Sequence, residues 1–475
     1  MLFNSVQYLF FLPIVFLLYW FVFRSLKWQN LLIVFASYVF YGWWDYRFLL
    51  LIAFTTICSY FSAIIVERQK AAGGGGKIPA ISNIVINLVI LGVFKYYNFF
   101  TESLAVAFEA FGIHFHPVTL NLILPVGISF YTFQALSYTI DVYRGKLKAT
   151  HDPISFFAFI SFFPQLVAGP IERATNLLPQ FQAKRGFDYS TAVDGTKQIL
   201  WGLFKKMVIA DNCADIVDSV WNNYSSYSSP MLILAAVLFS FQIYGDFSGY
   251  SDIAIGTGKL FGIRLMRNFI NPYLSRSVAE FWKRWHISLN TWFVDYVYIP
   301  LGGSREGKWK AIRNTFVIFL LSGLWHGANW TYVTWGLYHA ALFLPLLLLG
   351  SNRKYKDTVA EGRVLPSLSE LFKVVTTFCL ATFGWIIFRA SSISDFWRYI
   401  KSLAINWTLP LDISGIKVLF FICILTVVEW LNRSREHAFA FHLKNVYLRW
   451  CLYILVAFLC LTEAGKQAQF IYFQF

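Results

Sequence analysis

The sequence predicts an all-α, polytopic integral membrane protein. Of its 475 residues, 57% are hydrophobic and only 14% are charged, whereas a soluble domain carries about 25% charged residues. Such a chain has too little polar surface to cover a water-facing exterior. Apolar runs recur from end to end, and many are long enough to cross about 30 Å of hydrocarbon. We expect a single membrane domain over residues 1–475 with roughly eleven to thirteen membrane helices, accompanied by re-entrant or amphipathic helices.

The apolar runs give the expected spans in order. The first, 6–23, lacks the basic start and small-residue cleavage site of a signal peptide, so we expect it to be retained as a span. The later spans are expected at 29–43, 47–66, 80–100, 119–142, 153–168, 195–210, 229–256, 311–325, 330–349, 371–389, 415–431 and 447–464. The glycine-rich stretch 70–77 is expected to be a flexible loop, because it lacks the Lys-Ser/Thr of a phosphate-binding loop.

The distribution of Lys and Arg along the chain is that of a membrane protein. The net charge is +15, but Lys and Arg sit mostly in short loops between the apolar runs. This is the positive-inside bias of an inner-membrane protein, and we expect no nucleic-acid partner. Segments 101–118 and 212–229 contain neither Lys nor Arg. The bias therefore puts the N-terminus outside, the loops 67–79 and 433–449 inside, and the C-terminal tail outside.

The six cysteines indicate neither a disulfide framework nor a metal site. They form no Cys-x-x-Cys pair, and most lie inside apolar runs. We interpret them as small buried apolar residues and expect no metal.

Residues 257–314 differ from the rest of the chain. They mix aromatic residues with many Lys and Arg residues and contain no clean apolar 20-residue run. A lipid-facing helix would not tolerate that mixture, whereas amphipathic helices at the cytoplasmic surface, or re-entrant helices lining a cavity, would. This polar exception directly precedes the span pair expected at 311–349.

His326 is the first candidate for chemistry. It lies in "GLWHGANW", inside an expected span, where the imidazole loses its water and must be hydrogen-bonded or used by the protein. A lone histidine in a span is more often a helix–helix hydrogen-bonder. Here, however, Gly323 and Gly327 would allow close approach, and Asn329 would share its helical face. We predict His326 as catalytic, with Trp325 and Asn329 as substrate or tunnel residues.

The other histidines are weaker candidates for a catalytic role. His339 would lie about 220° from His326 around a continuous helix, so we interpret it as packing. Its neighbour Tyr338 is a candidate tunnel residue. The remaining histidines in loops or at span ends, for which hydrated or capping roles are expected, are His114, His116, His151, His437 and His442.

His286 is the second candidate, within "FWKRWHISLN". Trp282 lies one turn before it and Asn290 one turn after it, and Lys283 and Arg284 add positive charge. A cationic, aromatic segment suits an anionic, nucleotide-like or phosphopantetheine-bearing donor. The competing interpretation is an interfacial amphipathic helix with snorkelling basic residues. We predict that His286 is catalytic and that Trp282 and Asn290 contact substrate.

Other enzyme classes fit poorly, because the sequence contains no His-Glu-x-x-His, no Gly-x-Ser-x-Gly and no Walker motif. Asp246, Asp252 and Asp295 lie among apolar aromatic residues, and such acids can form an intramembrane ion path. A transporter is therefore the alternative, although no corresponding partner half is visible. Asp295 is also a candidate tunnel residue.

Four motifs resemble those of the membrane-bound O-acyltransferase family, in particular its alginate and cell-wall-polysaccharide O-acetylation branch. The motifs are "FFPQLVAGPIER" (162–173), "YGDFSGYSDIAIG" (244–256), "FWKRWHISLNTWFVDYVYIPLGGSR" (281–305) and "LSGLWHGANWTYVTWGLYH" (321–339). The first residues, the stretch 125–145 and the ending "FIYFQF" also resemble that branch, so the likeness covers essentially the whole chain.

The resemblance implies a ring of membrane helices around a central funnel or tunnel, with His326 as the family's catalytic histidine and His286 as its second functional one. It implies transfer of an acetyl group across the inner membrane to an exported or cell-wall polysaccharide. The donor would be acetyl-CoA or another acyl thioester, a substrate rather than a bound cofactor. Expected partners are membrane lipid and a separate periplasmic acetyltransferase. The alternatives are D-alanyl transfer to teichoic acid and a transporter without catalysis.

In the expected mechanism, neutral His326 acts as general base on the attacking hydroxyl. Asn329 or a nearby N–H stabilises the oxyanion. His286, expected at the inner face, holds the donor or assists protonation, so that the two histidines act in series along one tunnel.

Overall fold

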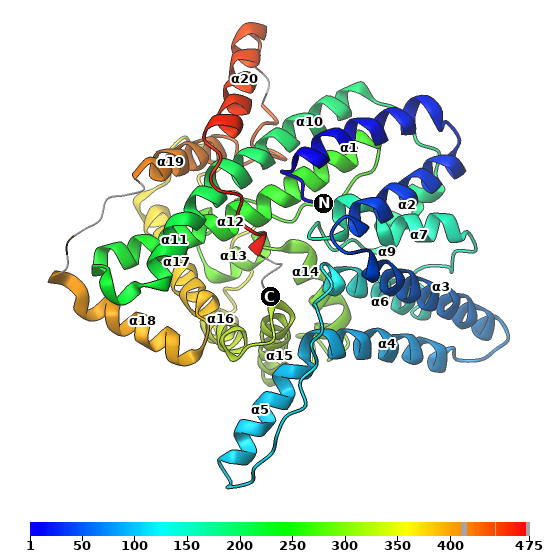
Figure 1. The fold of residues 1–475 in the computed structure, drawn as a ribbon, viewed down its shortest axis with the longest axis horizontal. Coiled ribbons are helices and arrows are strands. Elements are labelled where there is room, and N and C mark those ends of the chain that lie inside the picture. Colours follow the sequence, from blue (N-terminus) through cyan, green and yellow to red (C-terminus); the bar gives the residue numbers. More distant parts are fainter. Residues whose placement is uncertain (409, 411–415, 442, 472–475) are drawn as a thin grey trace. The chain divides into compact units, whose positions relative to one another are not determined.

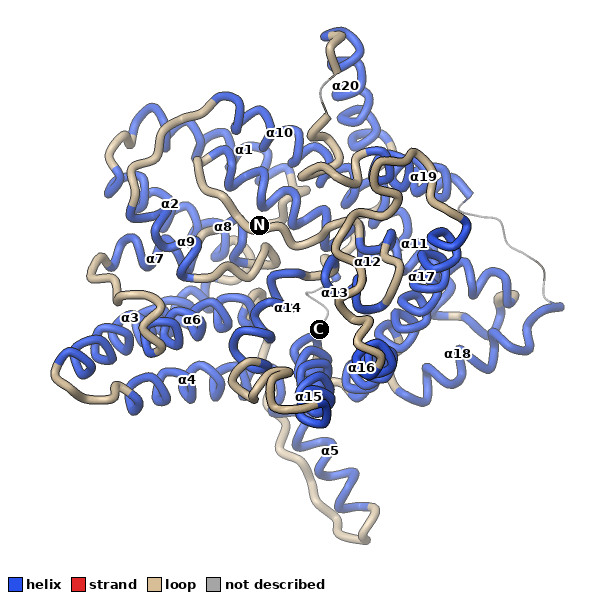
Figure 2. The backbone as a smooth tube through the Cα atoms, turned by 180° about the vertical axis from the view of Figure 1, so that it is seen from behind, coloured by secondary structure: helices blue, strands red, loops and turns tan. Residues whose placement is uncertain are grey.

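The computed structural model describes residues 1–408, 410, 416–441 and 443–471. It is 71% helical, and every described segment is helix or loop (Figure 2). The predicted all-α class is thus confirmed. The chain divides into two compact units, Met1–Ala192 with Thr257–Met266, and Val193–Gly256 with Arg267–Phe475.

The membrane character is confirmed by length and composition. Among the described residues, five helical stretches are long and apolar enough to cross a membrane: Tyr46–Ala71, Lys77–Glu109, Ser229–Leu260, Trp330–Leu348 and Leu368–Arg389. Val6–Val22 and Val446–Thr462 are shorter apolar helices. The roughly eleven to thirteen spans expected from the sequence stay a prediction. Several of the expected runs fold as short or interrupted helices.

The first unit is a set of helices labelled in Figure 1, except for α8, which is labelled in Figure 2. They are α1 (Val6–Leu17), α2 (Leu26–Gly42), α3 (Leu49–Ala71), α4 (Lys77–Leu91), α5 (Tyr97–Glu109), α6 (Ile128–Tyr143), α7 (Pro153–Ser161), α8 (Phe163–Leu166) and α9 (Ala174–Gln182). Buried polar side chains join them. Asn83 of α4 donates to Thr139 of α6 at 2.8 Å and accepts from Ser59 of α3 at 3.3 Å. Such contacts between small and polar residues hold helices together where lipid supplies no hydrophobic drive.

Two expected boundaries in this unit are wrong. The span expected to end at residue 100 continues as helix as far as Glu109. The span expected to start at 119 begins instead at Ile128, after Gly127 in the left-handed region (φ 75°). A Cβ on Gly127 would lie 2.5 Å from the carbonyl oxygen of Leu166. This backbone contact, which apolar patterning does not reveal, sets the start of α6.

The second unit holds both candidate histidines. Its helices are α10 (Tyr189–Leu203), α11 (Asp211–Asn222), α12 (Ser229–Leu260), α13 (Val278–Arg284), α14 (Ile287–Phe293), α15 (Lys308–His326), α16 (Trp330–Leu348), α17 (Leu368–Arg389), α18 (Ile393–Ile405), α19 (Ile416–Leu431) and α20 (Val446–Thr462). The first residues of α10 and the last turn of α12 belong to the first unit. The region 257–314 is predicted to lack a clean span, and between the end of α12 at Leu260 and the start of α15 at Lys308 its helices are all short.

Glycines let the helices of this unit approach closely. A Cβ on Gly202 of α10 would lie 2.6 Å from the carbonyl oxygen of Gly249 of α12. A Cβ on Gly323 of α15 would lie 2.2 Å from the carbonyl oxygen of Tyr332 of α16, and one on Gly336 would lie 2.3 Å from that of Phe319. Backbone therefore packs on backbone, and α15 and α16 run side by side as a hairpin (Figure 1). This hairpin carries His326.

Candidate active site

His326 is the last residue of α15. Gly327 is extended (φ −169°, ψ 159°) and ends the helix, and Asn329 is the N-cap of α16. Asn329 accepts from the backbone N–H of Thr331 at 3.0 Å and donates to the carbonyl of Ser391 at 2.9 Å. The expectation that Asn329 shares a helical face with His326 is therefore wrong, because the helix stops between them. Its amide joins the hairpin turn to the end of α17.

The two glycines around His326 serve packing. Gly323 meets the backbone of Tyr332, and a Cβ on Gly327 would lie 2.2 Å from the Tyr332 ring. The close approach predicted from these glycines is real, but the group that approaches is the second helix of the hairpin.

His286 lies between α13 and α14 in an unusual backbone conformation. Its φ of 46° and ψ of 54° are in the left-handed region, which costs a non-glycine residue roughly 1–2 kcal/mol. Two backbone hydrogen bonds hold it there. The N–H of Ile287 donates to the carbonyl of Asn268, and the N–H of Ile270 donates to the carbonyl of Arg284, both at 3.0 Å. The segment 268–270 thus fixes both sides of His286.

The fold brings the two candidate histidines together. The ring centroids of His286 and His326 are 6.4 Å apart. Trp325 contacts both rings, at 5.6 Å and 5.1 Å. His286 is only 1% exposed and His326 only 3%. The expectation that His286 lies apart from His326 along a tunnel is therefore wrong, whereas its place at the inner face stays a prediction. Both imidazoles belong to one buried aromatic cluster.

Aromatic rings complete this cluster. Around His326 stand Trp335 at 5.1 Å and Phe388 at 5.4 Å. Trp335 also contacts His339 at 5.0 Å, and Trp282 contacts His339 at 4.9 Å. His339 is thus packed against these indoles, in keeping with the packing interpretation.

Burial sets the protonation state of His286. Removal from water lowers the pKa of His286 to about 3, because a low-dielectric surrounding penalises the charged imidazolium. The ring is therefore neutral at physiological pH and has one N–H and one lone pair.

Asn268 is a site residue that sequence reasoning missed. Its Oδ1 lies 3.1 Å from Nδ1 of His286, and it accepts from the backbone N–H of Ser288 at 3.2 Å and from the Ser288 hydroxyl at 2.9 Å. On its other side, Nδ2 donates to the hydroxyl of Ser251 of α12 at 3.3 Å. No motif marks Asn268, and only the tertiary contact with His286 reveals it.

Three predicted tunnel residues share one cavity. Trp282, Asn290 and Asp295 line a cavity of about 470 Å³, together with the basic side chains of Lys283 and Arg353. Trp282 also reaches the cluster around His326 through Trp335, with ring centroids 5.5 Å apart. The cavity therefore joins cationic groups to the aromatic wall of the histidine site.

Two of the predicted tunnel residues have structural contacts. Nδ2 of Asn290 donates to the carbonyls of Trp282 at 2.6 Å and Trp285 at 2.7 Å, which caps the end of α13. The hydroxyl of Tyr338 donates to the carbonyl of Leu380 at 2.9 Å and ties α16 to α17.

Two of the three acidic residues that kept a transporter interpretation open, Asp246 and Asp252, are ion-paired. Asp252 lies 2.5 Å from Nζ of Lys205, and Asp246 lies 2.7 Å from Nζ of Lys206, which also pairs with Asp211 at 2.7 Å. Buried charges of this kind are stable in a membrane because they are paired. The lysines follow α10, so the pairs are invisible in the local sequence around each aspartate.

The C-terminal segment also contributes to this unit, which the sequence did not predict. The backbone N–H of Ile471 donates to Asp246 at 2.7 Å, and the carbonyl of Ala468 accepts from Lys206 at 3.3 Å. Phe470 is buried against Tyr250 with ring centroids 4.9 Å apart. The only signal in the sequence is the aromatic, uncharged ending.

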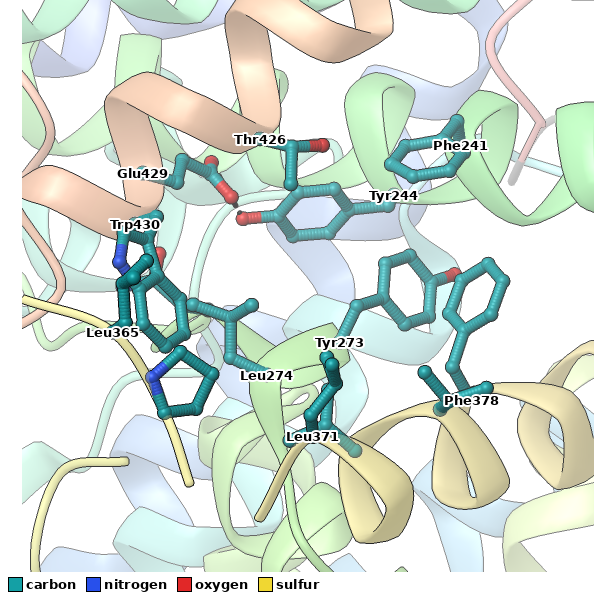
Figure 3. A pocket seen from close by; sticks show the side chains of 14 residues that line it. Phe241, Tyr244, Tyr273, Leu274, Leu365, Leu371, Phe378, Thr426, Glu429 and Trp430 are labelled. Carbon is teal, nitrogen blue, oxygen red and sulfur yellow. Dashed lines mark hydrogen bonds between the residues drawn. The ribbon is translucent and has the colours of Figure 1, made fainter. Parts of the chain in front are cut away.

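A further cavity of about 450 Å³ lies between α12, α17 and α19. Figure 3 shows the Tyr244 hydroxyl turned toward Glu429, to which it donates at 2.8 Å, while the remaining wall is mainly apolar. Tyr273 on this wall contacts Trp285 at 6.0 Å, next to His286 in the chain. The cavity borders the aromatic cluster but contains neither candidate histidine.

The fold and the site define a multi-pass membrane protein with a buried histidine pair. A family model described as the membrane-bound O-acyltransferase family matches residues 144–387, which include both histidines. The chain belongs to this family and is an O-acyltransferase.

The similarity to individual relatives agrees with the family assignment. The chain is 42% identical to "Probable alginate O-acetylase AlgI" of Pseudomonas aeruginosa, over 85% of this chain and 75% of that protein. It is 32% identical to the peptidoglycan O-acetyltransferase of Helicobacter pylori, over 99% of this chain and 91% of that protein. It is also 32% identical to the teichoic acid D-alanyltransferase of Bacillus subtilis, over 56% of this chain and 69% of that protein.

Proposed function

We propose that this protein transfers an acetyl group from a cytoplasmic thioester, most simply acetyl-CoA, across the bacterial inner membrane for O-acetylation of an exported or cell-wall polysaccharide. The names of the relatives support this proposal, since those similar over the larger share of the chain are named for O-acetylation of alginate or peptidoglycan. Similarity to the D-alanyltransferase covers a smaller share. The immediate acceptor is a hydroxyl, carried either by the polysaccharide or by a periplasmic acetyltransferase partner.

The observation that carries the proposal is the histidine pair. Two buried imidazoles with centroids 6.4 Å apart offer a proton acceptor in a dry, aromatic site, which is what activation of a hydroxyl requires. Burial keeps His286 neutral, and a neutral imidazole is the form that accepts a proton.

The reaction balances with these groups. His326 takes the proton of the acceptor hydroxyl while its oxygen attacks the thioester carbonyl. The new C–O bond forms, the C–S bond breaks, and the proton passes to the leaving thiolate, which departs as a thiol. His286 supplies a second acceptor nitrogen in the same cluster, which can share the proton between these steps.

Indole N–H groups are the oxyanion donors in this scheme, in place of Asn329, whose amide is engaged elsewhere. Nε1 of Trp335 and Nε1 of Trp285 are buried, and neither has an acceptor among the described residues. Trp335 contacts the ring of His326. A preorganised donor aimed at a developing oxyanion is worth about 10²–10³ in rate.

The cavity lined by Trp282, Lys283 and Arg353 is the donor pocket in the proposal. Its volume of about 470 Å³ lies within the range of small-molecule sites, about 300–1,000 Å³. The two basic side chains suit the phosphates of a CoA-type donor, and Trp282 leads from the pocket to the cluster around His326.

The test is transfer of labelled acetyl from acetyl-CoA by purified protein in proteoliposomes, with its periplasmic partner and polysaccharide added. We expect release of CoA and label on the acceptor, both lost in His326→Ala. His339→Ala is the matched control, since it removes a buried imidazole that packs on the same Trp335, and it should cost much less. Equal activity of the His326→Ala and wild-type proteins would refute the assignment.

A further inference from the structure

One hydrogen bond settles the orientation of the Asn268 amide, and two others are consistent with it. The backbone N–H of Ser288 can only donate, and it points at the atom placed as Oδ1, 3.2 Å away. The hydroxyl of Ser288 approaches the same atom at 2.9 Å. On the far side of the amide, Nδ2 donates to Ser251. A flipped amide would set an N–H against the N–H of Ser288, so the acceptor oxygen must face His286.

This orientation decides which nitrogen of His286 carries the proton. An amide oxygen accepts and cannot donate. Nδ1 of His286, 3.1 Å from Oδ1, must therefore hold the N–H of the neutral ring. The lone pair is then on Nε2, the nitrogen on the other side of the ring from Asn268.

We propose that Asn268 is a positioning residue that holds His286 in the Nδ1–H tautomer, so that Nε2 is the proton-accepting atom in acyl transfer. The inference rests on the proposed function for its consequence in catalysis, whereas the tautomer itself is a property of the resting protein. The Asn268 backbone fixes the same histidine through its carbonyl, which accepts from Ile287 at 3.0 Å. One residue thus sets both the left-handed backbone and the ring tautomer of His286.

The groups around His286 determine how its pKa, and with it the pH dependence of acetyl transfer, responds to a substitution at position 268. Its neighbours from other elements include the neutral rings of Phe247 of α12 at 4.6 Å, Phe269 at 6.5 Å and Trp325 of α15 at 5.6 Å, together with the titratable His326. A new carboxylate at position 268 would stand directly against Nδ1. It would favour the charged imidazolium and raise the pKa of His286.

Kinetic tests use three variants in the acetyl-transfer assay. Asn268→Leu removes the acceptor, and kcat should fall about 10²–10⁴-fold at every pH with KM little changed, since His286 in the wrong tautomer can no longer accept a proton at Nε2 and share it with His326. Asn268→Asp keeps an acceptor and should retain activity at high pH, but its acid limb should move to higher pH. Ser251→Ala leaves Oδ1 in place and should stay near wild type. Wild-type kcat in Asn268→Leu, or an unshifted profile in Asn268→Asp, would overturn the proposal.

A second measurement needs no donor or acceptor. Ring-¹⁵N-labelled histidine in membrane-embedded protein distinguishes Nδ1–H from Nε2–H by solid-state NMR, and His286→Gln assigns the signal. We expect the Nδ1–H tautomer in wild-type protein and in Ser251→Ala, and its loss in Asn268→Leu. An Nε2–H tautomer of His286 in wild-type protein would overturn the proposal even if acetyl transfer is confirmed. Conversely, the Nδ1–H result would stand if the acetyl donor proved to be wrong.

Discussion

Because α15 and α16 pack closely as a hairpin, we predict that one added methyl group at Gly323 lowers both stability and activity strongly. Gly323 lies one turn before His326, and its position faces the backbone of the partner helix. In Gly323→Ala the new Cβ would lie 2.2 Å from the carbonyl oxygen and 2.9 Å from the carbonyl carbon of Tyr332. The contacting atoms are backbone, so no side-chain rotation relieves the overlap and the helices must separate.

The magnitude follows from these distances. Ordinary contact of a Cβ begins near 3.4 Å, so the two backbones must separate by roughly 1 Å, and overpacking of this kind costs about 1–3 kcal/mol. Because His326 is on the same helix, the shift displaces the imidazole from the cluster around Trp335. A displacement of about 1 Å at a catalytic group can lower the rate about 10²-fold. We therefore expect Gly323→Ala to accumulate in the membrane with reduced thermal stability and about 1% of wild-type transfer.

The assay is acetyl transfer in proteoliposomes, normalised to folded protein by size-exclusion chromatography. The matched control is Gly92→Ala, a helical glycine in another apolar stretch, whose added Cβ would meet nothing within 4 Å. Gly92→Ala should retain activity and stability. Wild-type rate and stability in Gly323→Ala would refute the close packing of the hairpin as the device that positions His326.

Three further predictions concern the buried Lys206 ion pairs, the indole of Trp335 and the membrane topology. Lys206→Met leaves Asp211 and Asp246 buried without their cation and should destabilise the protein by about 3–5 kcal/mol, measured by thermal unfolding in detergent. The control Lys310→Met removes an exposed ion pair and should change stability by under about 1 kcal/mol. Equal effects of the two variants would contradict the burial of the Lys206 ion pairs. Trp335→Phe should lower kcat about 10²-fold with little change in KM if its N–H stabilises the oxyanion, and an unchanged kcat would exclude that donor. A cysteine replacing Gly75 in a cysteine-free background should resist impermeant thiol reagents added outside intact cells, and rapid labelling there would contradict the topology drawn from the basic loops.

The positions of the long apolar helices were predictable because hydrophobic length is a local property. The run expected at 229–256 is α12 (Ser229–Leu260), and that expected at 330–349 is α16 (Trp330–Leu348). The amphipathic helix α18 (Ile393–Ile405) was missed, since it is too short and too polar to register as a span. Helix ends fixed by remote backbone, such as the start of α6 against Leu166, leave no pattern in the local sequence.

The site was predictable in its residue types but not in its geometry. His326 and His286 stand out because imidazoles and basic groups are rare among apolar runs. The backbone of His286 is fixed by its pairing with the segment 268–270, a tertiary contact without a sequence signature. A continuous helix would place Asn329 on the same face as His326, but the extended Gly327 interrupts the helix between them.

The central claim is that His286 and His326 form one catalytic unit instead of acting in series. The direct measurement is kcat at saturating acetyl-CoA for His286→Ala, His326→Ala and the double variant. Residues that act as a unit are strongly non-additive. Because the imidazoles are 6.4 Å apart, we expect His286→Ala to stay deeply defective at saturating donor and the double variant to be no slower than the slower single variant. Rescue of His286→Ala by high acetyl-CoA, or a double variant whose loss is the product of the two single losses, would contradict it.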